Sequence, residues 1–316
     1  MNGMPSRQIS PSSACQNGNY RRTVSTCRGG FTILELLTVI LILTVLLALL
    51  LPSLGSARES ARRIQCQNQM RQLGTALHGY HDLNHSLPPG LKWEETEQSA
   101  YGWAVPLLGF LEQRAVSEQI HVDLPLTNPL NSEARYSSIA TFLCPSDITV
   151  ETFTLYTEIE EIPLQEPSPL MELPTASYLG VFGTIEADED FPIPDGDGAF
   201  VDSKPIRFAE LQRGLSNTII VGERTMSTVP STWLGVDVQG EDAACRLVGS
   251  AMTSPNCREC DECEFSSRHT EGVNFLWGDG HVQMIGNGID QELYKTLSKR
   301  QSANNLTFTF SAISGE

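Results

Sequence analysis

A continuous apolar segment at positions 31–51 constrains the fold of this 316-residue chain more than any other feature. Its only charged residue is Glu35, and its other polar side chains are threonines. As a helix it would be roughly 30 Å long, the thickness of a bilayer's hydrocarbon core. A buried core helix is seldom apolar on every face, and a signal peptide has a shorter apolar region before its cleavage site. The segment is therefore predicted to be a single transmembrane helix.

The leader before this segment, residues 1–30, carries four arginines and no Asp or Glu, and it shows no helical or strand periodicity. This pattern is typical of a peptide that is removed during processing. Arginines flank the apolar segment on both sides in nearly equal number. The positive-inside rule therefore leaves the orientation of the helix open.

Glu35 is costly inside a membrane, by about 2.5–3.5 kcal/mol on insertion scales, which indicates a specific partner. Cleavage between Gly30 and Phe31 would create a positively charged amino terminus, with Glu35 as the fifth residue of the mature chain. In a bundle of staggered helices, the Glu35 carboxylate could pair with the Phe31 amine of a neighbouring subunit. Alternatively, Glu35 favours the helix dipole and extends toward the membrane interface. The residues alone leave both roles open.

The sequence GGFTILELLTVILILTVLLALLLPSL closely resembles the class III signal of type IV prepilins and type II secretion pseudopilins. The shared features are a basic leader, Gly30 before the cleavage site, Phe31 after it and Glu35 at the fifth mature position. The resemblance implies cleavage by a prepilin peptidase, methylation of Phe31, and assembly with like subunits or other pseudopilins through Phe31 and Glu35. It also implies a cytoplasmic N-terminus and a C-terminal domain outside the cytoplasmic membrane.

Further segments, in this order, are similar to the family called domain of unknown function 1559, whose members are prepilin-like. They are CQNQMRQLGTALHGYHDLNHSLPPG (66–90), YGWAVPLLGFLEQ (101–113), TFLCPSD (141–147), GLSNTIIVGER (214–224) and an H-x9-DG motif formed by His269, Asp279 and Gly280. The similarity covers about residues 31–286. It implies a pilin-like fold, in which a long N-terminal helix packs on an antiparallel sheet, and the family has no assigned biochemical role.

The rest of the chain is predicted to be α+β. Apolar residues recur at helical spacing, so 52–85 is expected to continue the membrane helix as an amphipathic helix with a kink at Pro52. The remainder, 86–316, is the expected extracytoplasmic head domain. Its predicted elements are helices at 104–120 and 289–299, strands at 139–144, 152–157, 177–182, 217–222, 273–277 and 281–285, and an exposed insertion at 158–174. Asp-Gly in WGDGH, 277–281, predicts a β-hairpin.

Six cysteines remain after the leader is removed, and an even number outside the cytoplasm favours disulfides. Cys66 and Cys144 lie in separate segments of the family resemblance, so they are the preferred pair and would fasten the long helix to the sheet. The other four are expected to form two short-loop bridges. The alternative is a four-thiolate zinc or iron-sulfur site. These four are Cys245, Cys257, Cys260 and Cys263.

Three groups of residues suggest metal sites, each with a structural alternative. His269, Asp279 and His281 suit zinc, or else flank a hairpin. The acidic loop 188–202 suits calcium through residues such as Asp195 and Asp197, or else is simply solvated. Three histidines on one helical face suit a metal, or else form a polar stripe; they are His78, His81 and His85. The structural alternatives are favoured, so no cofactor is expected, and a structural calcium or zinc ion is the disfavoured alternative.

The net charge of −17 argues against a nucleic-acid-binding surface, which needs a basic stripe. The chain has no P-loop, dinucleotide fingerprint, nucleophile elbow or H-E-x-x-H motif, so we do not expect an enzyme. The expected function is a processed, membrane-anchored structural subunit of a type IV pilus or a type II secretion pseudopilus. The alternative is a membrane-tethered ligand-binding or sensing domain that does not polymerise.

Overall fold

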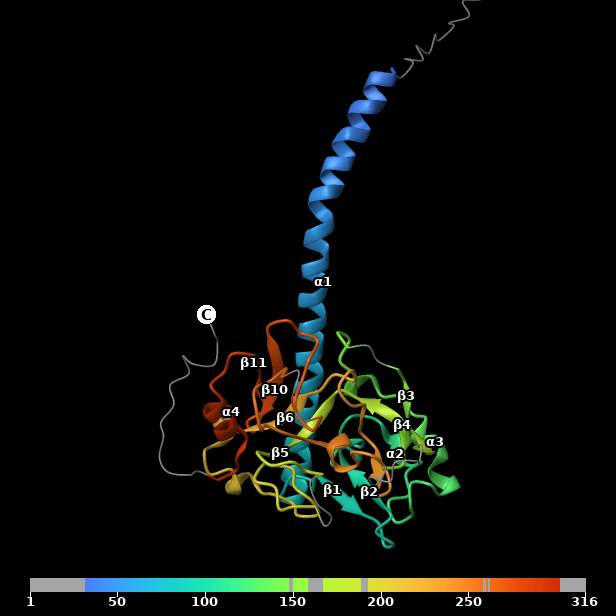
Figure 1. The fold of residues 1–316 in the computed structure, drawn as a ribbon, viewed down its shortest axis with the longest axis vertical. Coiled ribbons are helices and arrows are strands. Elements are labelled where there is room, and N and C mark those ends of the chain that lie inside the picture. Colours follow the sequence, from blue (N-terminus) through green and yellow to red (C-terminus); the bar gives the residue numbers. More distant parts are fainter. Residues whose placement is uncertain are drawn as a thin grey trace, which may run out of the picture. The chain divides into compact units, whose positions relative to one another are not determined.

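Figure 1 shows the computed structural model of the chain. It describes residues 32–147, 150–158, 167–188, 193–257, 260 and 262–301, without the side chains of 50–54 and 56. The leader, Gly30 and Phe31 lie outside the described residues. The chain divides into two compact units, Met1–Ser53 and Leu54–Glu316. Their boundary falls within the long helix α1, Ile33–Asn84.

The first unit contains the N-terminal part of α1, whose large apolar side chains from Ile33 to Leu49 are between 47% and 79% exposed. Thr32 and Glu35 form a capping box at the helix start. The Glu35 carboxylate accepts a hydrogen bond from the Thr32 N–H at 2.9 Å, and the Thr32 hydroxyl oxygen accepts one from the Glu35 N–H at 3.2 Å. The Glu35 carboxylate therefore accepts hydrogen bonds from the backbone N–H and the hydroxyl of Thr32, at the start of its own helix.

The predicted helix is present in this unit from Ile33 onward. Among the described residues, no helix combines the length and the apolar composition needed to cross a membrane. The predicted transmembrane segment, 31–51, includes Phe31 and the side chains at 50 and 51, which lie outside the described residues.

In the second unit, α1 is the predicted amphipathic helix and ends at Asn84, close to the expected boundary. Cys66, Met70, Leu73 and Leu77 have an exposed fraction of 0%. They recur at steps of four, three and four residues, which places them on one helical face. This face fastens the helix to the sheets of the same unit.

The second unit is α+β, as predicted, and its main sheet has five strands in the order β11-β10-β6-β5-β9. Neighbouring strands are antiparallel except β5 and β9. Side chains of β10 alternate between two faces. Asn274 accepts a hydrogen bond from Gln67 of α1, whereas Phe275 packs edge-to-face against Tyr294 of α4. The sheet is therefore buried between two helices (Figure 1).

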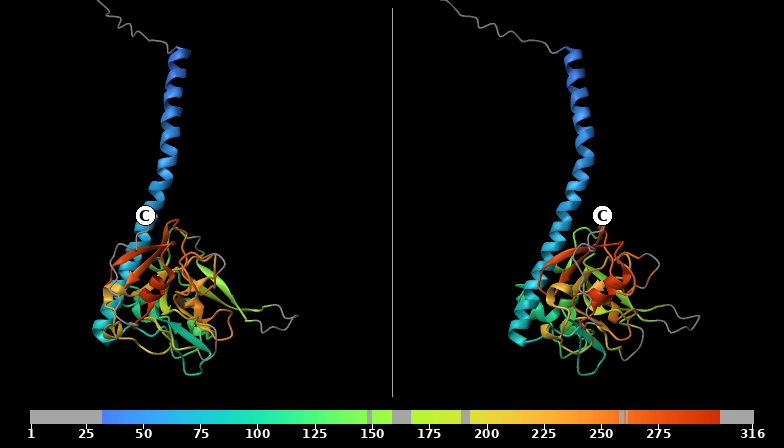
Figure 2. Two further views of the ribbon diagram at one scale, coloured as in Figure 1. Left: turned by 60° about the vertical axis from the view of Figure 1, so that its left-hand side comes forward. Right: turned by 90° about the vertical axis from the view of Figure 1, so that its left-hand side faces the viewer.

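Two three-stranded sheets complete the second unit, in the orders β1-β2-β8 and β3-β4-β7. Figure 2 shows β3 and β4 extending as a hairpin beyond the neighbouring strands. The described strands are β1 Leu91–Trp93, β2 Ser99–Gly102, β3 Thr152–Tyr156, β4 Pro169–Ala176, β5 Tyr178–Gly183, β6 Ile219–Glu223, β7 Ser231–Thr232, β8 Gly235–Asp237, β9 Val248–Ser250, β10 Gly272–Trp277 and β11 Val282–Gly286.

Short helices connect these strands. The remaining α-helices are α2 Arg114–Ser117, α3 Ser132–Arg135 and α4 Gln291–Ser298, and the 3₁₀ helices are η1 Val105–Leu107, η2 Pro129–Asn131, η3 Ala140–Phe142, η4 Phe208–Glu210, η5 Leu215–Asn217 and η6 Ala244–Arg246. Helix α4 confirms the prediction at 289–299. Its N-cap is Asp290, whose side chain accepts a hydrogen bond from the Leu293 N–H.

Predicted strands at 152–157, 177–182, 217–222, 273–277 and 281–285 are confirmed within one or two residues by β3, β5, β6, β10 and β11. The predicted strand at 139–144 is wrong. Those residues form η3 and a turn, because Phe142 and Cys144 are buried by tertiary contacts rather than by strand pairing. Apolar periodicity does not distinguish these two causes of burial.

The predicted helix at 104–120 is also wrong in its length. Pro106 does begin a helical turn, but η1 and α2 are separated by turns, and Glu112 between them has a left-handed φ of 61°. The predicted insertion at 158–174 is wrong in its second half. There β4 begins at Pro169 and buries Leu173, while 159–166 lie outside the described residues.

Candidate functional site

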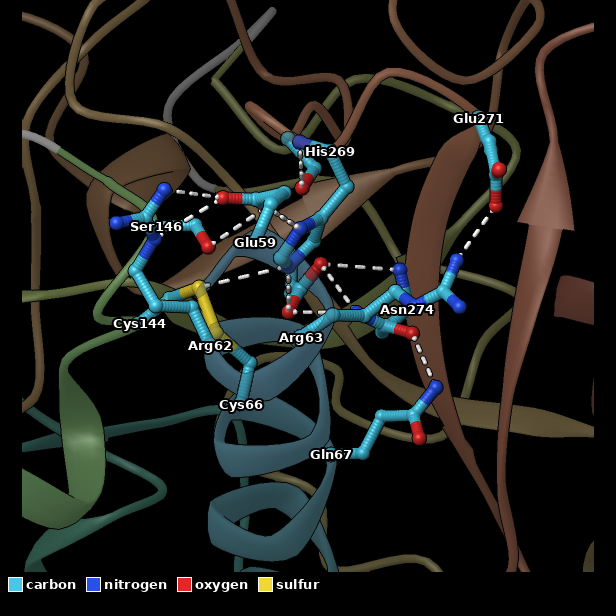
Figure 3. A network of polar contacts seen from close by, with 12 residues as sticks. Glu59, Arg62, Arg63, Cys66, Gln67, Cys144, Ser146, His269, Glu271 and Asn274 are labelled. Atoms are coloured by element: carbon cyan, nitrogen blue, oxygen red, sulfur yellow. Dashed lines mark hydrogen bonds and ion pairs between the residues drawn. A yellow bond between two sulfur atoms is a disulfide. The ribbon is translucent and has the colours of Figure 1, made fainter. Parts of the chain in front are cut away.

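His269 is the centre of a buried polar cluster in the second unit (Figure 3). It lies just before β10, and its side chain is 2% exposed. Its Nδ1 is 2.9 Å from Glu59 Oε1 on α1, and its Nε2 is 3.6 Å from Glu223 Oε1 on β6. Cys144 Sγ lies 3.7 Å from the same Nε2. The imidazole therefore links a helix, a strand and a cysteine that are distant in sequence.

The two carboxylates determine the charge of this imidazole. Burial by itself favours neutral His269, but hydrogen bonding and charge from Glu223 and then from Glu59 outweigh burial, so the pKa of His269 is raised. Burial likewise favours protonated Glu59, but hydrogen bonds from Arg62, His269 and Ser146 outweigh it and lower the pKa of Glu59. The arrangement therefore favours the protonated imidazole of His269 more than water does.

Glu223 continues the cluster back to the helix. Its carboxylate, 2% exposed, accepts hydrogen bonds from the Asn274 N–H and Nδ2 at 3.0 Å each. Asn274 Oδ1 in turn accepts a hydrogen bond from Gln67 Nε2 at 3.0 Å. Beside this chain, Arg63 forms an ion pair with Glu271. Glu59, Arg63 and Gln67 of α1 thus hold the helix against β10 and the segment before β10.

A further connection between α1 and the rest of the unit is covalent. Cys66 of α1 and Cys144 form a disulfide, which confirms the preferred pairing. Both residues are buried next to His269. The remaining cysteines form two further disulfides, Cys245–Cys263 and Cys257–Cys260, rather than a four-thiolate site.

The other end of the H-x9-DG motif forms a hairpin turn. Asp279 Oδ1 accepts a hydrogen bond from the His281 N–H at 3.1 Å and lies 2.6 Å from His281 Nδ1, and Gly280 has a left-handed φ of 90°. Strand β10 separates this turn from His269. Six residues of strand span roughly 20 Å, so His269 does not share a ligand with Asp279 and His281.

The remaining metal candidates also have structural partners. Asp197 accepts hydrogen bonds from the Thr184 N–H and hydroxyl and pairs with Lys299, and Asp195 pairs with Arg300. On α1, His78 Nε2 lies 2.9 Å from the Gly278 oxygen, and His81 stacks on Phe208. His85 ends the helix region with a left-handed φ of 60°. Each of these contacts fits the structural alternative.

The family model described as "Protein of unknown function (DUF1559)" matches residues 55–292. The chain belongs to this family. No curated protein matches it, and no solved structure matches it.

In this DUF1559 chain, four of the five segments that carry the resemblance meet at His269. Cys66, Cys144 and Glu223 come from three of the quoted segments, and His269 from the H-x9-DG motif. Their ligand-type side-chain atoms all lie within 4.8 Å of one another. The second such group in the described part of the chain contains two further disulfide-bonded cysteines, Cys245 and Cys263. The first group is therefore the candidate functional site.

Sequence reasoning did not identify Glu59, Glu223 or the cap formed by Thr32. Glu59 lies seven residues before Cys66 and so on the same helical face, which is a usable signal. Thr32-x-x-Glu35 before an apolar run is a capping-box signature. Glu223 lies in a segment of the family resemblance, 214–224, but nothing in that segment distinguishes it, since only the sheet brings it to the imidazole.

Proposed function

We propose that this DUF1559 chain is a prepilin-like structural subunit rather than an enzyme. A prepilin peptidase would cleave between Gly30 and Phe31, and segment 31–51 would anchor the product in the cytoplasmic membrane. The head would lie outside that membrane. The observation that carries the proposal is the exposure of apolar side chains all around α1 from Ile33 to Leu49, which requires a covering of lipid or of other apolar helices.

In this proposal, the His269 cluster gives the head a fixed attachment to the helix. One imidazole–carboxylate contact, one hydrogen-bonded amide pair and one disulfide join α1 to other segments of the second unit. A subunit that assembles through its helix needs such an attachment, because force on the helix must reach the head without local unfolding.

The proposed assembly role of Glu35 competes with its role in the capping box. Two substitutions separate them. Glu35→Gln keeps a residue suited to the capping box but removes the charge, whereas Thr32→Ala removes the cap but keeps the charge. If the charge pairs with a neighbour's Phe31 amine, E35Q abolishes incorporation into filaments and T32A preserves it. The reverse result would assign Glu35 to the cap alone.

A membrane-tethered binding or sensing domain is the alternative function, and cross-linking distinguishes the two. A photo-crosslinking residue placed at Leu41 in native membranes yields ladders of subunits if the helices assemble. Monomers alone would support tethering. Mass spectrometry of the mature chain tests the processing step, with a methylated Phe31 as the expected N-terminus and an intact leader as the contradicting result.

A further inference from the structure

The distances from His269 Nε2 to Cys144 and to Glu223 match those between neighbouring ligands of a tetrahedral zinc ion. Zinc–ligand bonds of about 2.0–2.3 Å place neighbouring ligand atoms roughly 3.3–3.8 Å apart. His269 Nε2 lies 3.7 Å from Cys144 Sγ and 3.6 Å from Glu223 Oε1. Cys66, the disulfide partner of Cys144, completes the set, and all four side chains are buried.

The outer contacts also match those of a zinc site. A histidine that binds zinc commonly donates its other ring N–H to a carboxylate, and here His269 Nδ1 lies 2.9 Å from Glu59 Oε1. Glu223 is oriented by hydrogen bonds from the Asn274 backbone and side chain. Because these contacts are already formed, neither the imidazole nor the Glu223 carboxylate has to reorient to bind an ion.

We propose that Cys66, Cys144, Glu223 and His269 bind one zinc ion when the Cys66–Cys144 disulfide is reduced. A dithiol reductant supplies two electrons and two protons to the disulfide and becomes a disulfide itself. Zinc binding then displaces both thiol protons and the Nε2 proton of His269, while Nδ1–H stays with Glu59. The bound ion and the disulfide are mutually exclusive, so the site reports the redox state of the chain.

The test uses the purified full-length chain in detergent, with Zn²⁺ and Co²⁺ as probes. A phosphine reductant is suitable, since it is converted to its oxide and leaves no competing dithiol. We expect one equivalent of Zn²⁺ per reduced chain and none per oxidised chain. Co²⁺ should give the near-ultraviolet thiolate-to-metal absorption of a site with two cysteines. A reduced chain that binds neither metal would overturn the proposal.

Variants assign the ligands. C66S/C144S should bind no metal, and His269→Gln should lower affinity more than Glu59→Gln, which should cost about 10–100-fold. The matched control is His281→Gln, an exposed histidine outside the cluster, with unchanged binding expected. Thermal unfolding of the oxidised single variants checks that they fold.

The second cysteine group provides the decisive comparison. Cys245 and Cys263 also lie near a carboxylate, that of Glu186. C245S/C263S should retain the metal and its cobalt spectrum. If this variant loses the metal while C66S/C144S keeps it, the site belongs to the other group and the proposal is wrong.

Discussion

Glu59 Oε1 and His269 Nδ1 lie 2.9 Å apart although 210 residues separate them in the chain. The contact joins α1 to the segment before β10. On its other side the imidazole faces Glu223. A single imidazole thus connects two acidic side chains from different elements, and the energetic contribution of its contacts can be measured.

We expect Glu59→Gln and His269→Gln to destabilise the oxidised chain by about 1–3 kcal/mol each, with the smaller value for the partly exposed Glu59. A double-mutant cycle measured by urea unfolding should give a coupling energy of about 0.5–2 kcal/mol. The matched control pair is Arg207 and Glu210, an exposed ion pair, where coupling should be below about 0.5 kcal/mol. Additive effects of E59Q and H269Q would contradict the assigned contact.

The same pair predicts a pH dependence. The pKa of His269 is raised in the folded state. Its contribution to the free energy of unfolding is therefore complete below the unfolded-state pKa of 6.5, and is lost as the pH rises through the folded-state pKa. The pKa of Glu59 is lowered in the folded state. Its contribution to the free energy of unfolding is therefore complete above the unfolded-state pKa of 4.5, and is lost as the pH falls through the folded-state pKa. The stability difference between wild type and H269Q should therefore be largest between pH 4.5 and 6.5. A pH-independent difference would count against an imidazolium.

The loss of stability on removing a disulfide should increase with the length of the loop that the disulfide closes. The Cys66–Cys144 bridge spans 78 residues and Cys257–Cys260 only 3. The chain-entropy model gives about 4.5 kcal/mol for the long loop and about 1.6 kcal/mol for the short one. The free energies of unfolding of C66S/C144S and C257S/C260S, measured with denaturant, should therefore differ by about 3 kcal/mol. Equal losses would show that the long bridge does not constrain the unfolded chain.

Gly280→Ala should destabilise the chain by about 1–2 kcal/mol through backbone strain, because Gly280 has φ of 90°. A Cβ there would have His78 as its nearest neighbour, at 3.7 Å, so steric overlap adds little. Gly288→Ala is the control, since its φ is not left-handed and no atom lies within 4 Å of its built Cβ. Thermal unfolding measures both. A G280A variant as stable as G288A would show that the turn tolerates an L-residue.

Asp188→Asn should stabilise the chain at neutral pH. Burial raises the pKa of Asp188 from 3.8 to about 6. The charges of Asp242 and Glu158 raise this pKa further, whereas the Ala244 N–H and Arg246 lower it. The folded state therefore holds more protons between these values, and stability falls as pH rises from 3.8 to 6. We expect D188N to be more stable by about 1–2 kcal/mol at pH 7, after allowing for partial exposure.

The advantage of D188N should disappear as the pH falls toward 4. The difference in free energy of unfolding between D188N and the wild type is measured at several pH values. The control is Asp123→Asn at an exposed position, which should change this free energy by less than about 0.5 kcal/mol. A D188N effect that does not change with pH would indicate altered packing instead of a removed charge.

The sequence by itself determined the features that depend on neighbouring residues. Helical spacing along 52–85 predicted the second half of α1, alternation predicted β10 and β11, and the Asp-Gly pair predicted their turn. The pairing of Cys66 with Cys144 followed from the family resemblance and is confirmed. Each of these follows from backbone geometry or from a motif that can be read along the chain.

Only the tertiary structure decided the partners of His269 and the conformation of 139–144. Glu59, Glu223 and His269 meet because α1 and β6 pack around one imidazole, and no local pattern encodes contacts across 210 residues. Phe142 and Cys144 are also buried by contacts with distant segments. Their apolar spacing therefore resembles that of a strand, although these residues pair with no strand. Hydrogen bonds between residues near in sequence determine the helices and turns. Desolvation and charge interactions between distant segments determine the contacts around His269.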